Sequence, residues 1–426
     1  MIKQLFLNRT VKNAGWLIGG KIAQMLINLF VGLLTARYLG PSNYGLINYA
    51  AAYTAFFSSL CTLGINSVLV KELIDHPDQE GTILGTSIFC RAVSSILSSI
   101  AIVCIVFVSD RGDPTTLAVV ILHSIGMIFH IFDVFNYRFQ AKLRSKVTAV
   151  VSLVAYIITA AYKVVLLMLN KNVEWFAFAT AIDYICIAIM LLGVYVRDGG
   201  AKLNVSFAYG KELLGKSRHF ILSGLMISVY AQTDKIMLKQ MIGDAEIGYY
   251  STAMSVCSVW CFVLSAIIDS LYPEIAKASN IDERLFAKRN KQLYAIVFYI
   301  STFVSILFTV FAELIVLVLY GEAYLPTVAP LRILTWSTAF SYLGVARNAW
   351  IVCKNRQKSL IRVYVAAAII NVLLNFLFIP AFGAAGASLA SLIAQVITAL
   401  IAPFFIRDLR ENSIMMVEAI MLKGLR

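Results

Sequence analysis

The sequence predicts an all-α polytopic membrane protein with twelve transmembrane helices in two six-helix lobes. Hydrophobic residues make up 60% of the 426 positions and charged residues 14%, whereas soluble globular chains hold about 45–50% and about 25%. Apolar runs of roughly 20 residues, the length that crosses a bilayer core, recur along the chain. Lysine and arginine gather in alternate connectors, as they do in cytoplasmic loops.

The first six predicted spans lie in residues 1–200, the expected N-terminal lobe. Each is an apolar run, and short turn-rich connectors such as "GPSNYG", "SDRGDP" and "NKNVE" separate most of them. The runs cover residues 15–36, 45–70, 83–108, 117–136, 147–169 and 175–195.

The other six spans lie in residues 201–426, the expected C-terminal lobe with a short cytoplasmic tail. The runs cover residues 220–239, 249–272, 293–319, 333–352, 363–379 and 387–406. The two longest connectors are 196–219, which divides the spans six and six, and 273–292. The chain ends "MIKQLFLNRTVK" and "ENSIMMVEAIMLKGL" are expected either as helices along the headgroups or as partly disordered tails.

The placement of lysine and arginine predicts the orientation. With the N-terminus in the cytoplasm, 26 of the 36 Lys and Arg residues fall on the cytoplasmic side, four on the opposite side and six within spans. This asymmetry predicts that both termini are cytoplasmic. It also explains the net charge of +13 without nucleic acid as a partner.

The two halves share an internal repeat. The segment "YLGPSNYGLINYA" at 38–50 aligns with "MIGDAEIGYYSTA" at 241–253 at an offset of 203 residues, which pairs Gly40 with Gly243 and Gly45 with Gly248. Both copies follow the first span of their half. A six-span repeat gives the two halves the same orientation, as in transporters that alternate access between two lobes.

Other classes of function lack their motifs. The sequence contains neither a GxxxxGK[ST] loop nor a GxGxxG after a strand, so no nucleotide site is predicted. The seven cysteines form no CxxC pair and are interpreted as packing residues, and the four histidines show no metal-ligand spacing, so no metal site is expected. His123 and His130 are seven residues apart and share a helix face, where satisfied buried histidines are the simpler interpretation.

Charged side chains deep inside the predicted spans are the candidate functional residues. Such residues cost roughly 2.5–3.5 kcal/mol each to insert, so they usually face a partner or a water-filled cavity. The deep set is Lys21, Arg91, Asp183, Asp234 and Lys235. We expect them to line a cavity, with structural ion pairs between helices as the alternative. The excess of cations suits an anionic, sugar-like or phosphate-bearing solute.

Three segments carry a resemblance to a known family. Residues 33–73 resemble the first two spans of Wzx-like polysaccharide biosynthesis flippases, which translocate O-antigen and capsule repeat units. Residues 232–253, with Asp234, are similar to that family's seventh span and the following turn, and residues 371–391 to its eleventh-to-twelfth connection. The matching motif residues, expected to be structural, are Arg37, Gly40, Tyr44, Gly45, Asn371, Asn375, Pro380, Gly383 and Gly386.

The resemblance implies membership of the multidrug/oligosaccharidyl-lipid/polysaccharide exporter superfamily, with two six-helix lobes around a central cavity. It implies a multi-pass protein of the bacterial inner membrane that flips undecaprenyl-pyrophosphate-linked oligosaccharides from the cytoplasmic to the periplasmic leaflet. The implied partners are the lipid-linked glycan, membrane lipids and the polysaccharide polymerase machinery. Lys235 departs from the family pattern, which often has arginine there, and a lysine cannot form a bidentate clamp.

On this basis we expect Lys21, Arg91 and Lys235 to attract the pyrophosphate. Asp234 would pair with Lys235, another cation or a coupling ion, and Asp183 is a second candidate for coupling. A proton, Na⁺ or the membrane potential would supply the driving force, with no other cofactor. The alternative is a multidrug antiporter of the same superfamily, which should have a cavity dominated by acids. A membrane enzyme such as a polymerase would need a large periplasmic loop, which the sequence lacks.

Overall fold

The computed structural model describes residues 9–424, apart from the side chains of residues 9–18, 67, 357, 358, 360 and 361. Within this part the chain forms helices and short turns and contains no β-strand. The predicted all-α fold is therefore confirmed. The expected interfacial segment at the N-terminus falls mostly outside the described residues, since the first helix begins at Arg9.

Eight helical stretches of the described chain are long and apolar enough to cross a membrane. Two of them consist of two segments each. Helix α2 (Arg9–Thr62) turns at Gly40, whose φ is 70°, and α13 (Gln357–Val396) turns at Gly383, whose φ is 55°. Glycine occupies both turns because residues with a side chain rarely adopt positive φ. With α9 (Phe207–Met241) and α12 (Val328–Cys353), the described chain supplies the twelve predicted spans.

The chain divides into two compact units. The first comprises Met1–Leu39 and Leu46–Ser228, and the second comprises Gly40–Gly45 and Val229–Arg426. The division therefore falls inside α9, whereas the sequence placed it at 200/201 in the long connector. The short segment Gly40–Gly45, which contains the first predicted turn, groups with the second unit.

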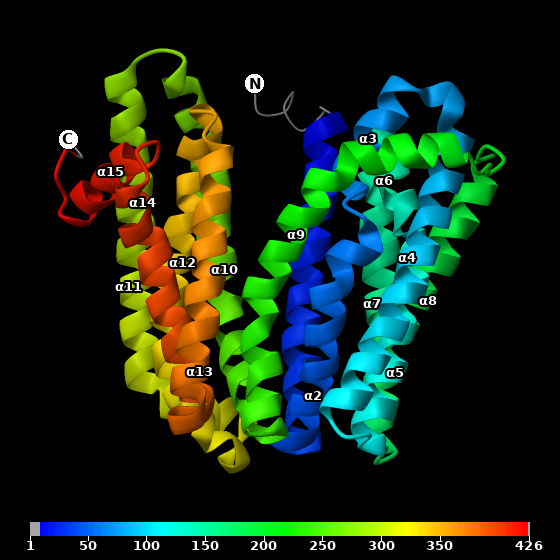
Figure 1. Ribbon diagram of the computed structural model, residues 1–426, viewed down its shortest axis with the longest axis horizontal. Coiled ribbons are helices and arrows are strands. Elements are labelled where there is room, and N and C mark those ends of the chain that lie inside the picture. The colour runs from blue at the N-terminus through cyan, green and yellow to red at the C-terminus, as the bar shows by residue number, and fades with distance from the viewer. Residues whose placement is uncertain (1–8, 425–426) are drawn as a thin grey trace. The chain divides into compact units, whose positions relative to one another are not determined.

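The first unit is a bundle around α5 (Pro114–Phe129). This helix packs between α4 (Glu80–Ser109) and α8 (Val173–Arg197), and α8 also packs on α7 (Ser145–Met168). Figure 1 shows these helices side by side. Helix α5 begins at Pro114. The preceding residue, Asp113, caps it by accepting a hydrogen bond of 2.8 Å from the amide of Thr116. Pro and an aspartate cap are a strong helix start signal.

Ion pairs connect helix ends of the first unit. One joins α4 to α6 (Val134–Ala141), and another joins α3 (Asn66–Asp75) to the start of α9. Arg138 Nε donates to Glu80 Oε1 at 2.6 Å and is buried. Glu72 accepts hydrogen bonds from Lys216 at 2.7 Å and Tyr209 at 2.9 Å. Partial burial raises the pKa of Glu72, but these two hydrogen bonds outweigh it and leave the pKa below its ordinary value.

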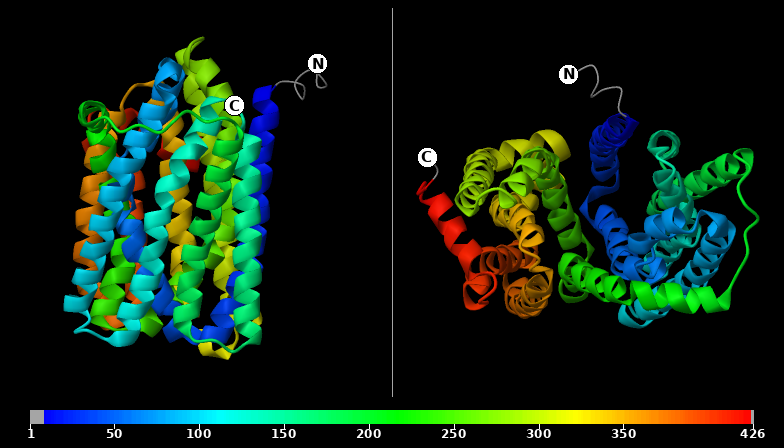
Figure 2. Two further views of the ribbon diagram at one scale, coloured as in Figure 1. Left: turned by 90° about the vertical axis from the view of Figure 1, so that its right-hand side faces the viewer. Right: turned by 90° about the horizontal axis from the view of Figure 1, so that it is seen from above.

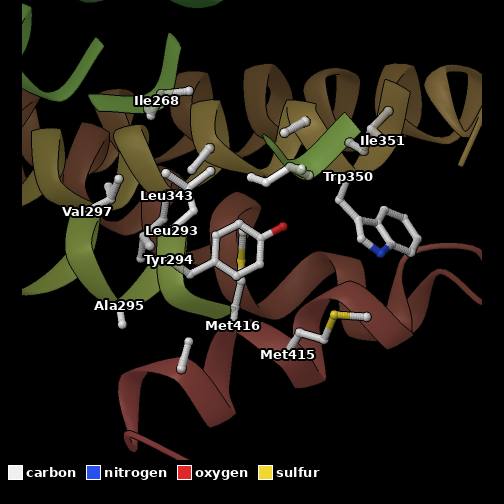
Figure 3. Packing of buried hydrophobic residues seen from close by; sticks show 14 of the residues in the cluster. Ile268, Leu293, Tyr294, Ala295, Val297, Leu343, Trp350, Ile351, Met415 and Met416 are labelled. Atoms are coloured by element: carbon white, nitrogen blue, oxygen red, sulfur yellow. The ribbon is translucent and has the colours of Figure 1, made fainter. Parts of the chain in front are cut away.

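The second unit is built around α12, which packs on α10 (Asp244–Ser279), α11 (Glu283–Tyr320) and α13. Viewed from above in Figure 2, most helices of this unit run along the viewing direction. At one end of the second unit, α15 (Arg410–Ile420) packs on α11. There Met416 lies against Tyr294, whose hydroxyl accepts a hydrogen bond of 2.6 Å from Asn412 (Figure 3). The C-terminal segment is thus part of the packed core rather than a free tail.

Candidate functional site

A cavity of about 480 Å³ lies inside the second unit, between α9, α10, α12 and α13. Seventeen residues line it, and Asp234 is the charged residue among them. This volume is within the roughly 300–1,000 Å³ typical of small-molecule pockets. The cavity therefore combines one deep carboxylate with room for a ligand.

Three neutral groups hold the Asp234 carboxylate, which is only 4% exposed. Tyr250 donates from its hydroxyl at 2.5 Å, Ser391 from its hydroxyl at 2.6 Å and Asn375 from its amide at 2.6 Å. The donors come from α10 and the two segments of α13. Hydrogen bonds to an ionised carboxylate are the strong kind, so this set orients the side chain firmly.

Asp234 does not pair with Lys235. In the described part of the chain, no lysine, arginine or histidine nitrogen lies within 4.0 Å of its carboxylate. Successive residues of a helix point about 100° apart, which turns Lys235 away from the carboxylate. Lys239, one turn later, pairs instead with Asp244 at 2.5 Å. Within the described residues the buried carboxylate thus has no ion-pair partner at 4.0 Å or less, which is costly unless a cation or a proton joins it.

Two asparagines complete this centre. Asn375 donates to both Asp234 and Asn371 Oδ1, the latter at 3.1 Å. Asn375 Oδ1 and Asn371 Nδ2 are buried and without a hydrogen-bond partner in the described chain. The sequence analysis treated both residues as structural parts of a motif and missed their contact with Asp234. Two amides four residues apart on an apolar helix are the signal that marks one polar face.

The first unit contains a second cavity of about 420 Å³, between α2, α5 and α8. His123 and His130, which the sequence placed on one face, both line it. Thr54 Oγ1 lies 3.3 Å from His123 Nδ1. His130, in the short helix η2 (His130–Asp133), stacks edge-on against Tyr184. Both imidazoles therefore have protein partners, as expected for satisfied buried histidines.

Arg91 is packed within the first unit and lines neither of these two cavities. Its side chain is 1% exposed. It donates to Asn66 Oδ1 at 3.3 Å and to the His130 carbonyl at 3.0 Å, which ties α4 to α3 and η2. These contacts fit a structural role between helices, although they are hydrogen bonds to an amide oxygen and a carbonyl rather than the ion pair that was the alternative expectation. Binding of a pyrophosphate by Arg91 stays a prediction.

The other predicted residues do not line this cavity of the second unit. Lys21 is exposed and lines a cavity of about 190 Å³ in the first unit, beside Asp133. Asp183 is half-buried on α8 and accepts a hydrogen bond of 3.4 Å from Thr159. Lys235 is half-buried. The three predicted cations Lys21, Arg91 and Lys235 are thus not gathered in one of the described cavities, and Asp234 alone of the candidates lines the larger one.

The motif residues form turns and close approaches. Gly45 packs against the backbone of Asp244 and Gly386 against that of Phe378, so neither site has room for a side chain. At the α13 turn, the carboxylate of Glu246 accepts a hydrogen bond of 2.5 Å from the amide of Ala384 beside Gly383. Arg37 and Pro380 are exposed and Tyr44 is half-buried. Within the described residues, no group of three or more His, Cys, Asp or Glu side chains is placed to hold a metal ion.

The sequence has full-length relatives. A capsular polysaccharide biosynthesis protein, CapF, of Staphylococcus aureus is 22% identical over 409 residues, which cover 93% of this chain and 98% of the relative. A putative O-antigen transporter of Escherichia coli K12 is 20% identical over 393 residues, which cover 89% and 94%.

Solved structures share the fold. The lipid II flippase MurJ in an inward closed conformation has a TM-score of 0.68 at 14% identity, covering 95% of this chain and 92% of that one. An inward-facing multidrug resistance MATE family transporter of the MOP superfamily has a TM-score of 0.67 at 16% identity, covering 93% and 96%. These likenesses show a two-lobe transporter fold.

A family profile described as polysaccharide biosynthesis protein matches residues 10–279, more than half of the chain. The resemblance noted in the sequence is therefore confirmed. This chain belongs to the polysaccharide biosynthesis protein family, whose relative in Escherichia coli is named a putative transporter rather than an enzyme, and its apolar helices make it a multi-pass membrane protein.

Proposed function

We propose that this protein flips undecaprenyl-pyrophosphate-linked oligosaccharide repeat units, of the O-antigen or capsule type, across the bacterial inner membrane by alternating access. The observation that carries the proposal is the unpaired Asp234 carboxylate inside the hydroxyl-lined cavity of the second unit. Names of full-length relatives support the glycan as cargo. The excess of lysine and arginine in alternate connectors supports cytoplasmic termini.

The chemistry of the cargo explains why a protein is needed. Each glycan hydroxyl that leaves water without a new partner costs several kcal/mol, so the headgroup cannot cross hydrocarbon alone. The protein has to replace water only along the path of the headgroup while the polyprenyl tail stays in lipid. The membrane potential favours outward movement of the anionic pyrophosphate by roughly 2.3 kcal/mol per charge per 100 mV.

Asp234 is the proposed site of the coupling cation, either a proton or Na⁺. Hard cations prefer oxygen ligands, and the centre offers the carboxylate together with the unpartnered Asn375 Oδ1. Occupation by a cation removes the cost of a lone buried charge. The return of the emptied carrier is then helped by a cation that enters at Asp234. Asp183, which accepts a hydrogen bond from Thr159, is the second candidate.

The pyrophosphate would be attracted by the accessible cations. Lys21 is exposed and beside a polar cavity, and Lys235 is half-buried. Arg91 is held by Asn66 and His130, so it would contribute through its charge or by holding helices together. Charge reversal of Lys21 and Lys235 together is expected to abolish surface glycan. Unchanged surface glycan in that variant would contradict this role.

The test is deletion of the gene in its own host, followed by analysis of lipid-linked oligosaccharide in each leaflet. A flippase predicts that repeat units accumulate on the cytoplasmic face and surface glycan is lost. Re-expression of Asp234→Asn should fail to restore glycan. Asp269→Asn, an exposed aspartate of α10, is the matched control and should restore it. Normal surface glycan with raised drug sensitivity would instead identify the multidrug antiporter whose fold this chain shares.

A further inference from the structure

The cavity of the second unit has an unusual density of hydroxyl groups. Nine of its seventeen lining residues are serine, threonine or tyrosine. Two of these hydroxyls, on Ser337 and Ser341 of α12, make no hydrogen bond within the described chain. The hydroxyl oxygens of Ser265 and Tyr342 lie 3.3 Å apart and form a hydrogen bond with each other. The walls thus present free hydroxyls together with an aromatic ring, on which the apolar face of a sugar packs well.

The cavity of the first unit is its counterpart in the internal repeat. Nine of the ten residues that line the first cavity correspond to lining residues of the second. On α2 and α10 the offset is 203, the same as for the paired glycines: Ala51, Thr54, Ala55 and Ser58 correspond to Met254, Cys257, Ser258 and Cys261. Elsewhere the offset is 211: His123, Met127, His130, Thr180 and Tyr184 correspond to Leu334, Thr338, Ser341, Ser391 and Gln395.

The two cavities carry hydroxyl groups at different positions of the repeat. Where the second unit has Thr338 and Ser341, the first unit has Met127 and His130. The same helix positions therefore pack without hydroxyl groups in the first unit. Conversely, Thr54 and Ser58 of the first unit stand where the second unit has Cys257 and Cys261, so the two cavities place their hydroxyls on different helices. Burial of polar groups without partners is costly unless a ligand or water meets them.

We propose that the cavity of the second unit binds the uncharged sugar residues of the glycan headgroup, an inference that rests on the proposed function. Its hydroxyls suit a polyhydroxylated ligand, because each can both donate and accept a hydrogen bond. The Asp234 carboxylate in its lining repels the pyrophosphate, which therefore lies outside this cavity. A lipophilic cation would pair with Asp234 but would leave Ser337 and Ser341 unmatched.

The test measures binding of a lipid-free probe to the purified full-length protein. The probe is the repeat-unit oligosaccharide released from the surface glycan of the host, and tetraphenylphosphonium is the competing lipophilic cation. The double variant Ser337→Ala/Ser341→Ala removes the two free hydroxyls and keeps good helix formers in α12. Ser58→Ala/Thr180→Val removes two hydroxyls from the first cavity and is the matched control. Thermal melts establish that both variants are folded.

Loss of one net hydrogen bond weakens binding roughly 2- to 12-fold. The Ser337→Ala/Ser341→Ala protein should therefore bind the oligosaccharide at least about fourfold more weakly, and the control should match the wild type. Equal weakening in both variants, or wild-type binding of tetraphenylphosphonium with none of the oligosaccharide, would overturn the sugar site. The deletion strain separates the two proposals. Normal glycan export in the deletion strain refutes the flippase, whereas loss of export in that strain together with wild-type sugar affinity in the double variant refutes only the sugar site.

Discussion

The two glycines of the internal repeat give the sharpest prediction about this fold. A Cβ atom added to Gly45 would lie 1.9 Å from the carbonyl oxygen of Asp244, and one added to Gly248 would lie 2.1 Å from that of Pro41. Pro41 and Asp244 are themselves related by the offset of 203 residues. Each repeat-related helix start therefore packs on the other, in a reciprocal arrangement.

A methyl group at either position has to push a backbone away. Ordinary contact begins at 3.4 Å, so the two segments must separate by about 1.3–1.5 Å. A side-chain neighbour would rotate out of the way, but a carbonyl of a helix start cannot. Overpacking costs about 1–3 kcal/mol, while the better helix propensity of alanine returns about 1 kcal/mol. The difference is a net loss of about 0–2 kcal/mol, and because the contacts are so close we expect Gly45→Ala and Gly248→Ala each to lower the free energy of unfolding by about 1–2 kcal/mol.

The assay is thermal unfolding of the purified protein in detergent, with surface glycan in the complemented deletion strain as a second readout. Gly193→Ala is the matched control, because that exposed glycine of α8 has nothing within 4 Å of its added Cβ. The control should be as stable as the wild type or slightly more stable. Since both methyl groups open the same contact, the double variant should cost less than the sum of the single ones. Single variants as stable as Gly193→Ala, or strictly additive losses, would refute the reasoning.

Three further predictions concern stability. Arg138→Met leaves the buried Glu80 paired with Lys142 alone. The free energy of unfolding should fall by an amount near the low end of about 3–5 kcal/mol, and an unchanged melting temperature would contradict this prediction. The pKa of Glu72 is lowered in the fold, so its contribution is complete above the ordinary 4.5 and is lost as pH falls through the folded value. The variant Glu72→Gln also loses the ion pair with Lys216. The melting temperatures of the wild type and this variant should therefore converge as the pH falls. A difference that stays constant down to low pH would contradict this contribution of Glu72. Met416→Ala opens a hole beside α11 and should cost about 2–5 kcal/mol, whereas a loss below 1 kcal/mol would show that α15 is loosely packed.

The spans and turns were predictable because their signals are local. A bilayer-length apolar run needs no information from elsewhere in the chain, and positive φ at a turn selects glycine directly. Gly40 and Gly383 accordingly stand at the two turns inside α2 and α13. The C-terminal segment was ambiguous, since its mixed pattern fits both a headgroup helix and a tail. Contact with α11 decided that it packs in the core.

The candidate site was predictable only in part. A carboxylate inside a predicted span marks a functional position, and Asp234 proved to line the large cavity of the second unit. Its partners Asn375 and Ser391 are 141 and 157 residues away in sequence, and no local pattern joins them to it. Arg91 gave the same sequence signal as Asp234, yet its guanidinium is used between helices. Depth in a span indicates the cost of a charge but not the direction in which it points.

The sequence by itself determined the membrane class, the spans, the repeat and the family motifs, because hydrophobicity and backbone conformation act over a turn or a single span. Only the tertiary structure decided that Gly45 and Gly248 pack reciprocally, that Asp234 is held by neutral donors and that two repeat-related cavities carry different chemistry. These features depend on side chains that helix packing brings together from distant segments. A one-dimensional pattern does not contain those distances.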